Sequence, residues 1–378
     1  MKICIYGYAL ATPGGGLFQY THALGKALVQ EGHNVTVVTR RWSGSVSTAR
    51  GLKYHFISVD SKFSSPLLNI KFALKSIFYF LRYRKDYDLI HCMSGFYSFV
   101  ILAALIRRSV HVPMVYSVLS PFRSRFGLTT FDKVICVSRN VMQRLGGDNS
   151  IYIPPFIEME RLKTNARYEF GAGFDFIIGT MGYPVYRKGI RYLVEAVPSI
   201  LKRFPKTLFL LAIDLPAIPY RKNLLVEKRY IAGLIKREGL EKNVRILGEV
   251  DVPKFLRSLN LFVYPVQTTM GMIDIPPTVL ECLAAGCGLV TSQQGGICEV
   301  VRDGFNGILV SRGEEDQPSA YADRIIYLME NKDLLESLRR NGPESVRRFD
   351  VKVVVPEIMK VYEGILAKEK KPNPKSST

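Results

Sequence analysis

The sequence predicts an α/β fold of two doubly wound domains, each a mostly parallel sheet with helices on both faces. Short apolar, β-branched runs alternate with helical patterns along almost the whole chain. Continuous apolar strands of this kind are typical of parallel sheets that are buried on both faces. The 378 residues also exceed the size at which one hydrophobic core usually stops growing. A polar, irregular segment near the middle separates two such series.

The first series starts at the N-terminus. Helical patterns run from Leu17 to Glu31, where Gly32 ends the helix, and from Ser65 to Arg84. Residues 95–106 form the longest uncharged apolar stretch, which is too short to span a bilayer and predicts a buried helix. Strands are expected at residues 2–8, 34–40, 54–60, 88–94, 113–119, 133–138 and 150–155.

The second series repeats this pattern, with strands expected at residues 175–182, 207–214, 243–249, 261–266, 288–292 and 306–310. A Pro-Pro turn and polar residues around 154–168 predict the linker. The N-terminal domain is therefore expected at residues 1–165 and the C-terminal domain at 166–350. Such a pair of sheets would face a cleft at the carboxyl ends of their strands. The basic tail, residues 367–378, is expected to be disordered.

The charge is unevenly distributed. The net charge is +19, and residues 1–165 carry 21 Lys and Arg against 8 Asp and Glu, a net of +13. This indicates an anionic partner such as anionic lipid or a phosphorylated substrate, or else simply a soluble basic surface. Nucleic acid is not expected, because the basic half has no recognised binding motif and no interleaved aromatic residues.

The six cysteines lie mostly within apolar runs, and no two form a CxxC pair. This pattern is typical of reduced, buried thiols in a cytosolic protein. The N-terminus reads as a strand and lacks the architecture of a signal peptide. We therefore expect a cytoplasmic protein.

Two glycine- or cation-containing loops precede helices. The glycines at 14–16 place backbone N–H groups at a helix start, which favours an anion, although a flexible turn without a ligand is the alternative. They fit neither the dinucleotide fingerprint nor the P-loop. Arg187 and Lys188 follow the strand at 175–182 and suit a diphosphate. A solvated surface pair is the alternative there.

Glu281 has two compatible interpretations. With Thr278 as N-cap, it fits the third helical position of a capping box. Alternatively, its carboxylate accepts hydrogen bonds from the vicinal hydroxyls of a ribose. Gly295 and Gly296 then supply amides at a further helix start, suitable for phosphates. The spacing alone does not decide between these interpretations.

Together these segments resemble the retaining family-4 glycosyltransferases, which have the GT-B fold of two Rossmann-like domains. The resemblance covers nearly the whole chain, and its segments keep their order. They include PGGG at 13–16, DLIHCMS at 88–94, KVICVSRNVMQRL at 133–145, RKGIRYLVEA at 187–196 and, most specific, the block at 278–310.

The resemblance implies sugar transfer, with retention, from a nucleotide-diphosphate sugar in glycan biosynthesis. It implies no metal and no other cofactor. A helix at 351–366 would pack back on the N-terminal domain. Glu281 would hold the donor ribose, and Lys188, with Arg187, would hold the diphosphate. The further donor-binding candidates are glycines, namely Gly15, Gly16, Gly248, Gly295 and Gly296.

Three positions depart from the family pattern. Ile273 stands where the family usually has a first Glu, and Asp274 beside it is expected to contact the sugar instead. Tyr183 replaces an arginine, for which Arg187 would compensate. Many members also have a histidine after the strand at 113–119, where this chain offers Ser117 and Ser120.

His91 and Ser120 are the acceptor-side candidates, and a structural role is the alternative for His91. Asp86 and Asp88 mimic the DxD of metal-dependent transferases. They precede their strand instead of following it, so they are interpreted as a turn and no metal site is predicted.

Residues 64–85 predict a basic amphipathic helix that would lie on an anionic membrane surface. The alternative is that its apolar face covers the sheet. An anionic membrane or a lipid-linked acceptor is therefore the expected partner, with a peripheral location on the inner face. Arg107, Arg108, Arg123 and Arg125 would add to the positive field. The helix has apolar residues at 67, 68, 70, 72, 74, 77, 78 and 81 and cations at 71, 75, 82, 84 and 85.

Two other functions fit the same fold. A catalytically impaired, nucleotide-sugar-binding GT-B protein would explain the three departures. Another GT-B enzyme, such as a nucleotide-sugar epimerase, is the second alternative. The sequence does not predict the base, the sugar or the oligomeric state.

Overall fold

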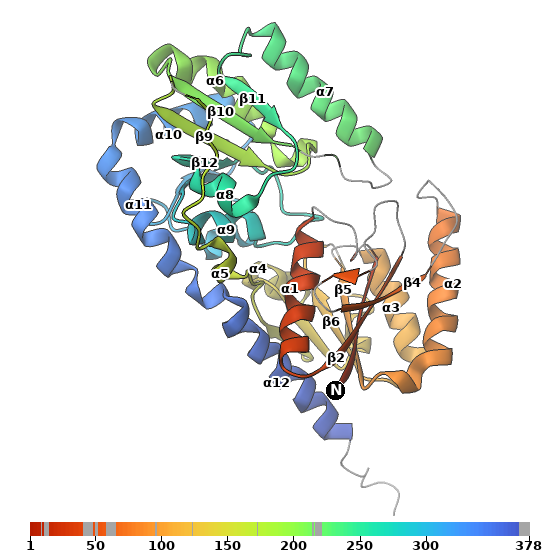
Figure 1. Cartoon of the computed structure of the whole chain (residues 1–378). Helices are drawn as coiled ribbons and strands as arrows, with labels where there is room; N and C mark the ends of the chain where they lie inside the picture. Colours follow the sequence, from red (N-terminus) through yellow and green to blue (C-terminus); the bar gives the residue numbers. More distant parts are fainter. Residues whose placement is uncertain are drawn as a thin grey trace, which may run out of the picture. The chain divides into compact units, whose positions relative to one another are not determined.

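The structure is a computed structural model that describes residues 1–8, 10, 15–40, 48–49, 52–57, 66–94, 97–122, 124–171, 173–213, 215 and 221–369. The chain forms two units (Figure 1). The first comprises Met1–Pro155, Met270–Asp274 and the residues from Val351 on, and the second comprises Phe156–Thr269 and Ile275–Asp350. Each unit contains one sheet of parallel strands with helices, which confirms the predicted fold class.

The chain passes between the units at more places than the sequence indicated. The first boundary follows Pro155, so residues 156–165 belong to the second unit and not to the N-terminal domain. The short segment 270–274 belongs to the first unit. Helix α12 (Val351–Glu369) also belongs to the first unit and packs on α1 (Gly16–Gln30). Residues 370–378 of the expected tail lie outside the described residues.

The first sheet has the strand order β3-β4-β2-β1-β5-β6-β7-β8, parallel except for the antiparallel pair β3 and β4. Every residue of β5 is buried, as are five of the six in β1, because both faces of these central strands are covered. Strand β3 was not predicted. The strands are β1 (Lys2–Gly7), β2 (Asn34–Arg40), β3 (Thr48–Ala49), β4 (Leu52–Ile57), β5 (Leu89–Ser94), β6 (Met114–Val118), β7 (Lys133–Cys136) and β8 (Ser150–Tyr152).

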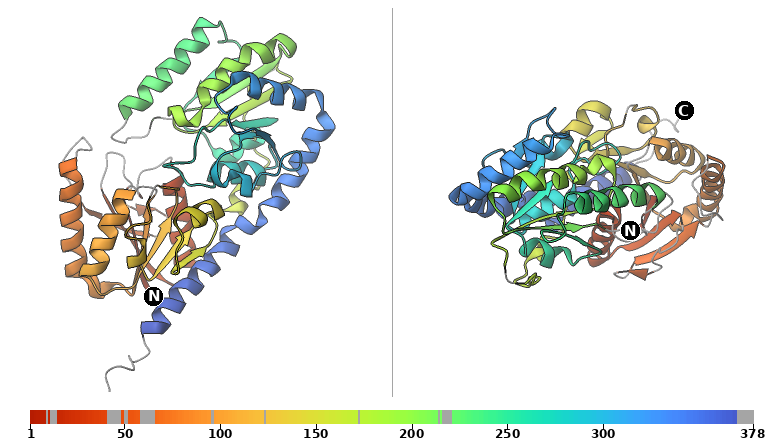
Figure 2. Two further views of the ribbon diagram at one scale, coloured as in Figure 1. Left: turned by 180° about the vertical axis from the view of Figure 1, so that it is seen from behind. Right: turned by 90° about the horizontal axis from the view of Figure 1, so that it is seen from above.

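Helices cover both faces of the first sheet. Phe72 and Phe80 of α2 and Phe99 of α3 surround Tyr6 of β1 on one face. Helices α2 and α3, coloured in shades of orange in Figure 2, pack side by side. His91 of β5 is in register with Ile5, the neighbour of Tyr6, and therefore points to the opposite face, where α12 packs. The remaining helices of this unit, apart from α1 and α12, are α2 (Pro66–Tyr83), η1 (Arg84–Asp86), α3 (Tyr97–Ser109), η2 (Leu128–Thr130) and α4 (Arg139–Leu145).

The second sheet has the order β11-β10-β9-β12-β13-β14, and all its neighbours are parallel. From β9 the chain moves outward to β11 and then returns to β12, on the other side of β9. The strands are β9 (Phe176–Met181), β10 (Thr207–Ala212), β11 (Val244–Leu247), β12 (Leu261–Tyr264), β13 (Gly288–Ser292) and β14 (Ile308–Val310).

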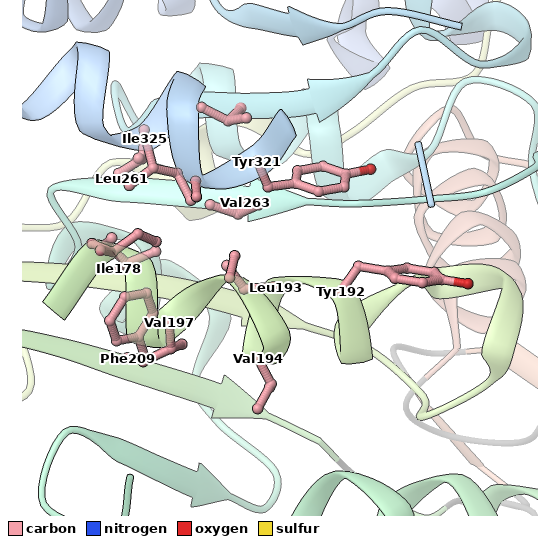
Figure 3. Close-up of a cluster of buried hydrophobic side chains, with 14 of the residues drawn as sticks. Ile178, Tyr192, Leu193, Val194, Val197, Phe209, Leu261, Val263, Tyr321 and Ile325 are labelled. Atoms are coloured by element: carbon pink, nitrogen blue, oxygen red, sulfur yellow. The ribbon is translucent and has the colours of Figure 1, made fainter. Parts of the chain in front are cut away.

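The core of the second unit lies between this sheet and its helices. Leu193 of α6 and Ile325 of α10 pack with Val263 of β12, and all three are fully buried (Figure 3). The helices are α5 (Met159–Leu162), η3 (Tyr186–Lys188), α6 (Ile190–Arg203), α7 (Arg221–Arg237), α8 (Val252–Arg257), α9 (Pro277–Ala284), η4 (Gly295–Glu299), α10 (Pro318–Glu330), α11 (Lys332–Ser345) and η5 (Arg347–Phe349).

The apolar stretch at 95–106 forms most of α3, where Val100, Ala103 and Ile106 are fully buried, which confirms the predicted buried helix. Across the described ranges, no helix combines the length and apolar character needed to cross a membrane. None of the six cysteines, all of them described, is in a disulfide, and five are buried while Cys298 is exposed.

Candidate active site

The strand order of the second sheet marks the place where a ligand is expected. Successive strands are added on one side of β9 up to β11 and on its other side from β12 on, so the strand order reverses between β9 and β12. Open α/β sheets bind ligands at such a point, outside the carboxyl ends of their strands. Lys188 follows β9, and Tyr264 is the last residue of β12. The predicted diphosphate-binding lysine therefore lies at the switch point.

The Lys188 ammonium group is held over an aromatic ring. Its Nζ lies 5.1 Å from the centroid of the Tyr264 ring. Within the described residues, Lys188 forms no ion pair with a carboxylate. A half-buried cation that rests on a ring and lacks a counter-ion is suited to an anionic ligand.

Two glycines allow this arrangement. Gly182 has φ +136°, and a Cβ added there would lie 2.7 Å from Nζ of Lys188. Gly189 has φ +66°, and its added Cβ would lie 1.9 Å from the carbonyl oxygen of Pro265. The N–H of Gln267 donates to the carbonyl of Arg187 at 2.7 Å, which fixes η3 to the loop after β12. The side chain of Arg187 is exposed on the same turn.

Gly295 and Gly296 open η4, which two residues separate from the end of β13. The first N–H groups of a helix have no partner within the helix. Gln294, the preceding N-cap, makes no side-chain cap, and its Nε2 donates instead to Glu315 at 2.8 Å. Gly248 is exposed directly after β11, so the donor glycines of this unit all follow carboxyl ends of strands.

The capping-box interpretation of Glu281 is wrong. Helix α9 begins at Pro277 with Pro276 as N-cap and has no side-chain cap, so Thr278 lies inside the helix. Glu281 lies in the second turn, and its Oε1 accepts a hydrogen bond from Nη2 of Arg161 in α5. Burial raises the pKa of Glu281, and the nearby Arg161 cation opposes this rise.

Sequence reasoning missed Arg161. It lies 120 residues from Glu281 in the sequence, and nothing in the local pattern links the two. The sequence around Arg161 shows only a Pro-Pro turn followed by a short segment with a cation beside an apolar residue, which does not indicate a partner.

Asp274 lies in the first unit and is fully buried. Its Oδ2 accepts hydrogen bonds from Oγ of Ser138 at 2.5 Å and from Nδ2 of Asn140 at 2.9 Å. Its own N–H donates to the carbonyl of Leu119 at 2.8 Å. These bonds support a structural role in holding segment 270–274 on the first sheet, and sugar contact by Asp274 stays a prediction.

The two acceptor-side candidates are also buried. Oγ of Ser120 accepts the N–H of Gly271 at 2.7 Å. His91 is hydrogen-bonded through Nδ1 to the Tyr362 hydroxyl at 2.5 Å and through Nε2 to Oγ of Ser117 at 2.7 Å. Burial lowers the pKa of His91 to about 3, so the ring is neutral. With both nitrogens engaged, the structural alternative for His91 is favoured over acceptor contact.

Gly15 and Gly16 mark the start of α1. Gly15 is the N-cap with an extended backbone, φ −102°, and no side chain caps this helix. Gly14 lies outside the described residues. Asp86 ends η1, and Asp88 accepts the N–H of Lys2 through Oδ2 at 2.7 Å. The predicted turn before β5 is therefore confirmed.

Helix α2 covers the sheet with one face, as the alternative for residues 64–85 expected, and membrane contact by its exposed face stays a prediction. Phe72, Ser76 and Phe80 are fully buried and cover the sheet. On the opposite side of the helix, Leu74 and Phe78 are 52% and 72% exposed. The described cations of this segment, Lys71, Lys75, Arg82, Arg84 and Lys85, are all exposed. The predicted side chains at 67, 68 and 70 lie outside the described residues, as does Arg123.

A cavity of about 580 Å³ in the second unit lies apart from these residues. It is lined by parts of α5, α9 and α11 together with Arg257 of α8. None of the predicted donor residues lines it. We assign the candidate site from the topology and the position of Lys188, because this cavity lies at the end of α9 that is remote from the switch point.

Two family models match the chain. "Glycosyltransferase Family 4" matches residues 14–161, and "Glycosyl transferases group 1" matches residues 176–331. A phosphatidyl-myo-inositol mannosyltransferase of Mycobacterium tuberculosis is 29% identical over 231 residues, 59% of this chain and 56% of that protein. The chain thus spans little more than half the length of this relative. An uncharacterized glycosyltransferase of Methanocaldococcus jannaschii is 25% identical over 74% of this chain and 76% of that protein.

Solved structures share the fold. Sucrose-phosphate synthase from Thermosynechococcus elongatus has a TM-score of 0.80 at 19% identity, covering 97% of this chain and 100% of that chain. Anabaena HepE, solved in complex with UDP and glucose, has a TM-score of 0.76 at 19% identity, covering 96% and 99%. At such identities the likeness establishes the two-domain architecture.

Proposed function

Because the chain belongs to the family-4 glycosyltransferases of the GT-B fold, we propose that it moves a sugar from a nucleotide-diphosphate sugar to an acceptor with retention. The observation that carries this proposal is the Lys188 ammonium group, held over Tyr264 at the switch point and without a carboxylate partner among the described residues. Such a cation suits the donor diphosphate.

The other residues proposed to bind the nucleotide-sugar donor belong to the same unit as Lys188. Arg187 adds a second cation on the same turn as Lys188. The amides at the start of η4, at Gly295 and Gly296, face the same end of the sheet. The carboxylate of Glu281 accepts hydrogen bonds from the ribose hydroxyls, and the backbone at Gly248 holds the base.

The proposed reaction requires mainly that the protein stabilise the negative charge on the departing phosphate. The bond between the sugar and the diphosphate breaks, and negative charge develops on the departing phosphate. Lys188, Arg187 and the helix amides stabilise this charge. In a front-face reaction the departing phosphate takes the proton of the acceptor hydroxyl, which bonds to the sugar on the face from which the phosphate leaves. The proposal includes neither a protein base nor a metal.

We propose that the acceptor is lipid-linked or lies at an anionic membrane on the cytoplasmic side. Leu74, Phe78 and Leu81 are exposed along one side of α2, at helical spacings of three and four. Lys71, Lys75 and Arg82 flank them, and a basic amphipathic face of this kind lies in the headgroup layer. The name of the mycobacterial relative, a phosphatidyl-myo-inositol mannosyltransferase, agrees with a lipid acceptor.

Nucleoside diphosphate release from a panel of nucleotide-sugars tests the donor half. We expect release by the parent and at least tenfold less by Lys188→Met, since the lost hydrogen bond to a charged group contributes roughly 1.5–3 kcal/mol. Lys206→Met is the control, because Lys206 precedes β10 at the opposite end of the sheet. Equal release by the two variants would contradict the proposed site.

A catalytically impaired, nucleotide-sugar-binding protein is the second candidate. Ile273 is buried at the position of the usual first Glu, and Tyr183 replaces the usual Arg. In that case the parent binds donor but releases no diphosphate with any acceptor, including lipid extracts. An epimerase would instead convert the sugar without an acceptor.

A further inference from the structure

The two oxygens of Glu281 have different surroundings. Oε1 accepts a hydrogen bond from Nη2 of Arg161, and their side chains are 12% and 30% exposed, respectively. No described group bonds Oε2. The carboxylate is therefore fixed on one side and available on the other.

Arg161 itself is held by its surroundings. Its backbone N–H donates to the backbone carbonyl of Glu158 at 3.1 Å, at the single turn of α5. The next residue, Leu162, is buried, and the N–H of Ile157 donates to the carbonyl of Phe349 at 2.9 Å. Helix α5 also packs directly on α9. The guanidinium group thus approaches Glu281 from an anchored backbone.

Few other charges act on Glu281. On α5, Glu160 pairs with Lys163. On α11, which also packs on α9, Glu336 pairs with Arg339, and both line the cavity at the C-terminal end of α9, as does Arg340. Strand β13 has no titratable side chain. Burial raises the pKa of Glu281 and Arg161 lowers it, so the guanidinium favours the ionised carboxylate.

We propose that Arg161 is a positioning residue for the donor nucleotide, which holds Glu281 so that Oε2 accepts hydrogen bonds from the ribose hydroxyls. This inference rests on the proposed donor site and adds the means by which the site reads a ribose. Arg161 does not touch the donor. A carboxylate accepts hydrogen bonds only, so a ligand that lacks the 2′-hydroxyl loses part of this contact.

The test compares nucleoside diphosphates with ribose and with 2′-deoxyribose. UDP, GDP and ADP are titrated into the full chain by calorimetry, and the tightest is compared with its deoxy form. We expect the parent to prefer the ribose form. Arg161→Met should lower ribonucleotide affinity by roughly tenfold, since a hydrogen bond to a charged group is lost or misaligned, and should leave deoxynucleotide affinity nearly unchanged.

The pH profile separates positioning from general support of the fold. Without Arg161 the pKa of Glu281 rises further, so the carboxyl group becomes protonated at a higher pH. A protonated carboxyl group is a weaker acceptor, because the charge-assisted hydrogen bonds to the ribose are lost. As the pH is lowered, the ribose preference of Arg161→Met should therefore be lost at a higher pH than that of the parent. Arg161→Lys keeps the charge and should restore part of the preference.

Two further variants complete the design. Arg203→Met removes another Arg–Glu pair of the same unit, with Glu330, and should leave both ligands unaffected. In a Glu281→Gln background, Arg161→Met should cause no additional loss. Equal weakening of both ligands, or tighter ribonucleotide binding by Arg161→Met, would overturn the inference alone. A parent that binds no nucleoside diphosphate would refute the proposed function and this inference with it.

Discussion

Substitution of Gly182 by alanine should reduce donor affinity without a change at any donor-binding side chain. The new Cβ would lie 2.7 Å from Nζ and 3.3 Å from Cε of Lys188. The favourable separation of non-bonded carbon and nitrogen atoms is about 3.5 Å, so the end of the lysine side chain must move by on the order of 1 Å. It would then leave its position over the Tyr264 ring, from which it is proposed to bind the diphosphate.

The size of the effect follows from two contributions. An alanine at φ +136° costs about 1–3 kcal/mol of stability through backbone strain alone. A hydrogen bond between the ammonium group and a phosphate contributes about 1.5–3 kcal/mol, so its loss weakens nucleotide binding roughly 10- to 100-fold. The first contribution appears in unfolding and the second in binding.

Gly173 provides a matched control. It has φ +123°, but an added Cβ there meets nothing within 4 Å. Denaturant unfolding and nucleotide titration are measured for both alanine variants. We expect similar losses of unfolding free energy, and a loss of affinity only for Gly182→Ala. Equal affinities in the two variants would refute the assignment of Lys188 to the diphosphate.

Three further predictions concern other parts of the chain. Glu281→Gln removes the ionic acceptor and should weaken a ribonucleoside diphosphate by roughly tenfold in calorimetry. Phe78→Ser should lower flotation with anionic vesicles, since Phe78 is 72% exposed on the basic side of α2. His91 has a pKa of about 3 in the fold, below its unfolded value near 6.5, so the unfolded state binds the extra proton. Stability should therefore fall as the pH drops below 6.5, by roughly 2 kcal/mol at pH 5, and His91→Gln should flatten this dependence in urea unfolding.

A specific outcome would contradict each of these three predictions. Unchanged nucleotide affinity in Glu281→Gln would leave Glu281 as a partner of Arg161 only. Flotation that ignores both lipid charge and salt, or an equal loss for the control Val226→Ser on α7 of the second unit, would remove α2 from the membrane proposal. An unfolding curve of the parent that stays level from pH 7 to pH 5 would contradict the buried neutral His91.

The local patterns of the sequence were sufficient for both sheets, apart from the short strand β3, and for the position of Lys188. Strand runs such as 88–94 are apolar because both faces are covered, and a loop after such a strand necessarily opens at the carboxyl edge. The placement of Lys188 needed only this rule. The fold class and the predicted helices at 17–31 and 65–84 were found on the same basis.

Contacts between distant segments were out of reach. Nothing around Asp274 indicates that it would bond Ser138, which lies 136 residues earlier. The capping box at Glu281 failed for a related reason. Pro277 is well suited to the first helical position, so α9 starts before Thr278 and the carboxylate turns to a residue of another helix. Periodicity describes which face is buried, but not which segment covers it.

The first unit is assembled from segments that are far apart in the sequence, and this affects the order in which it folds during synthesis. His91 and Tyr362 bond across 271 positions of the chain, so the first sheet leaves the ribosome long before the helix that covers one of its faces. At about 5–20 residues per second, the delay is on the order of 10–60 s. Throughout that interval the part of this face that α12 covers stays open, while α1 is already available to cover its neighbourhood. The first unit therefore cannot complete its packing before α12 has left the ribosome, even though its strands are made much earlier.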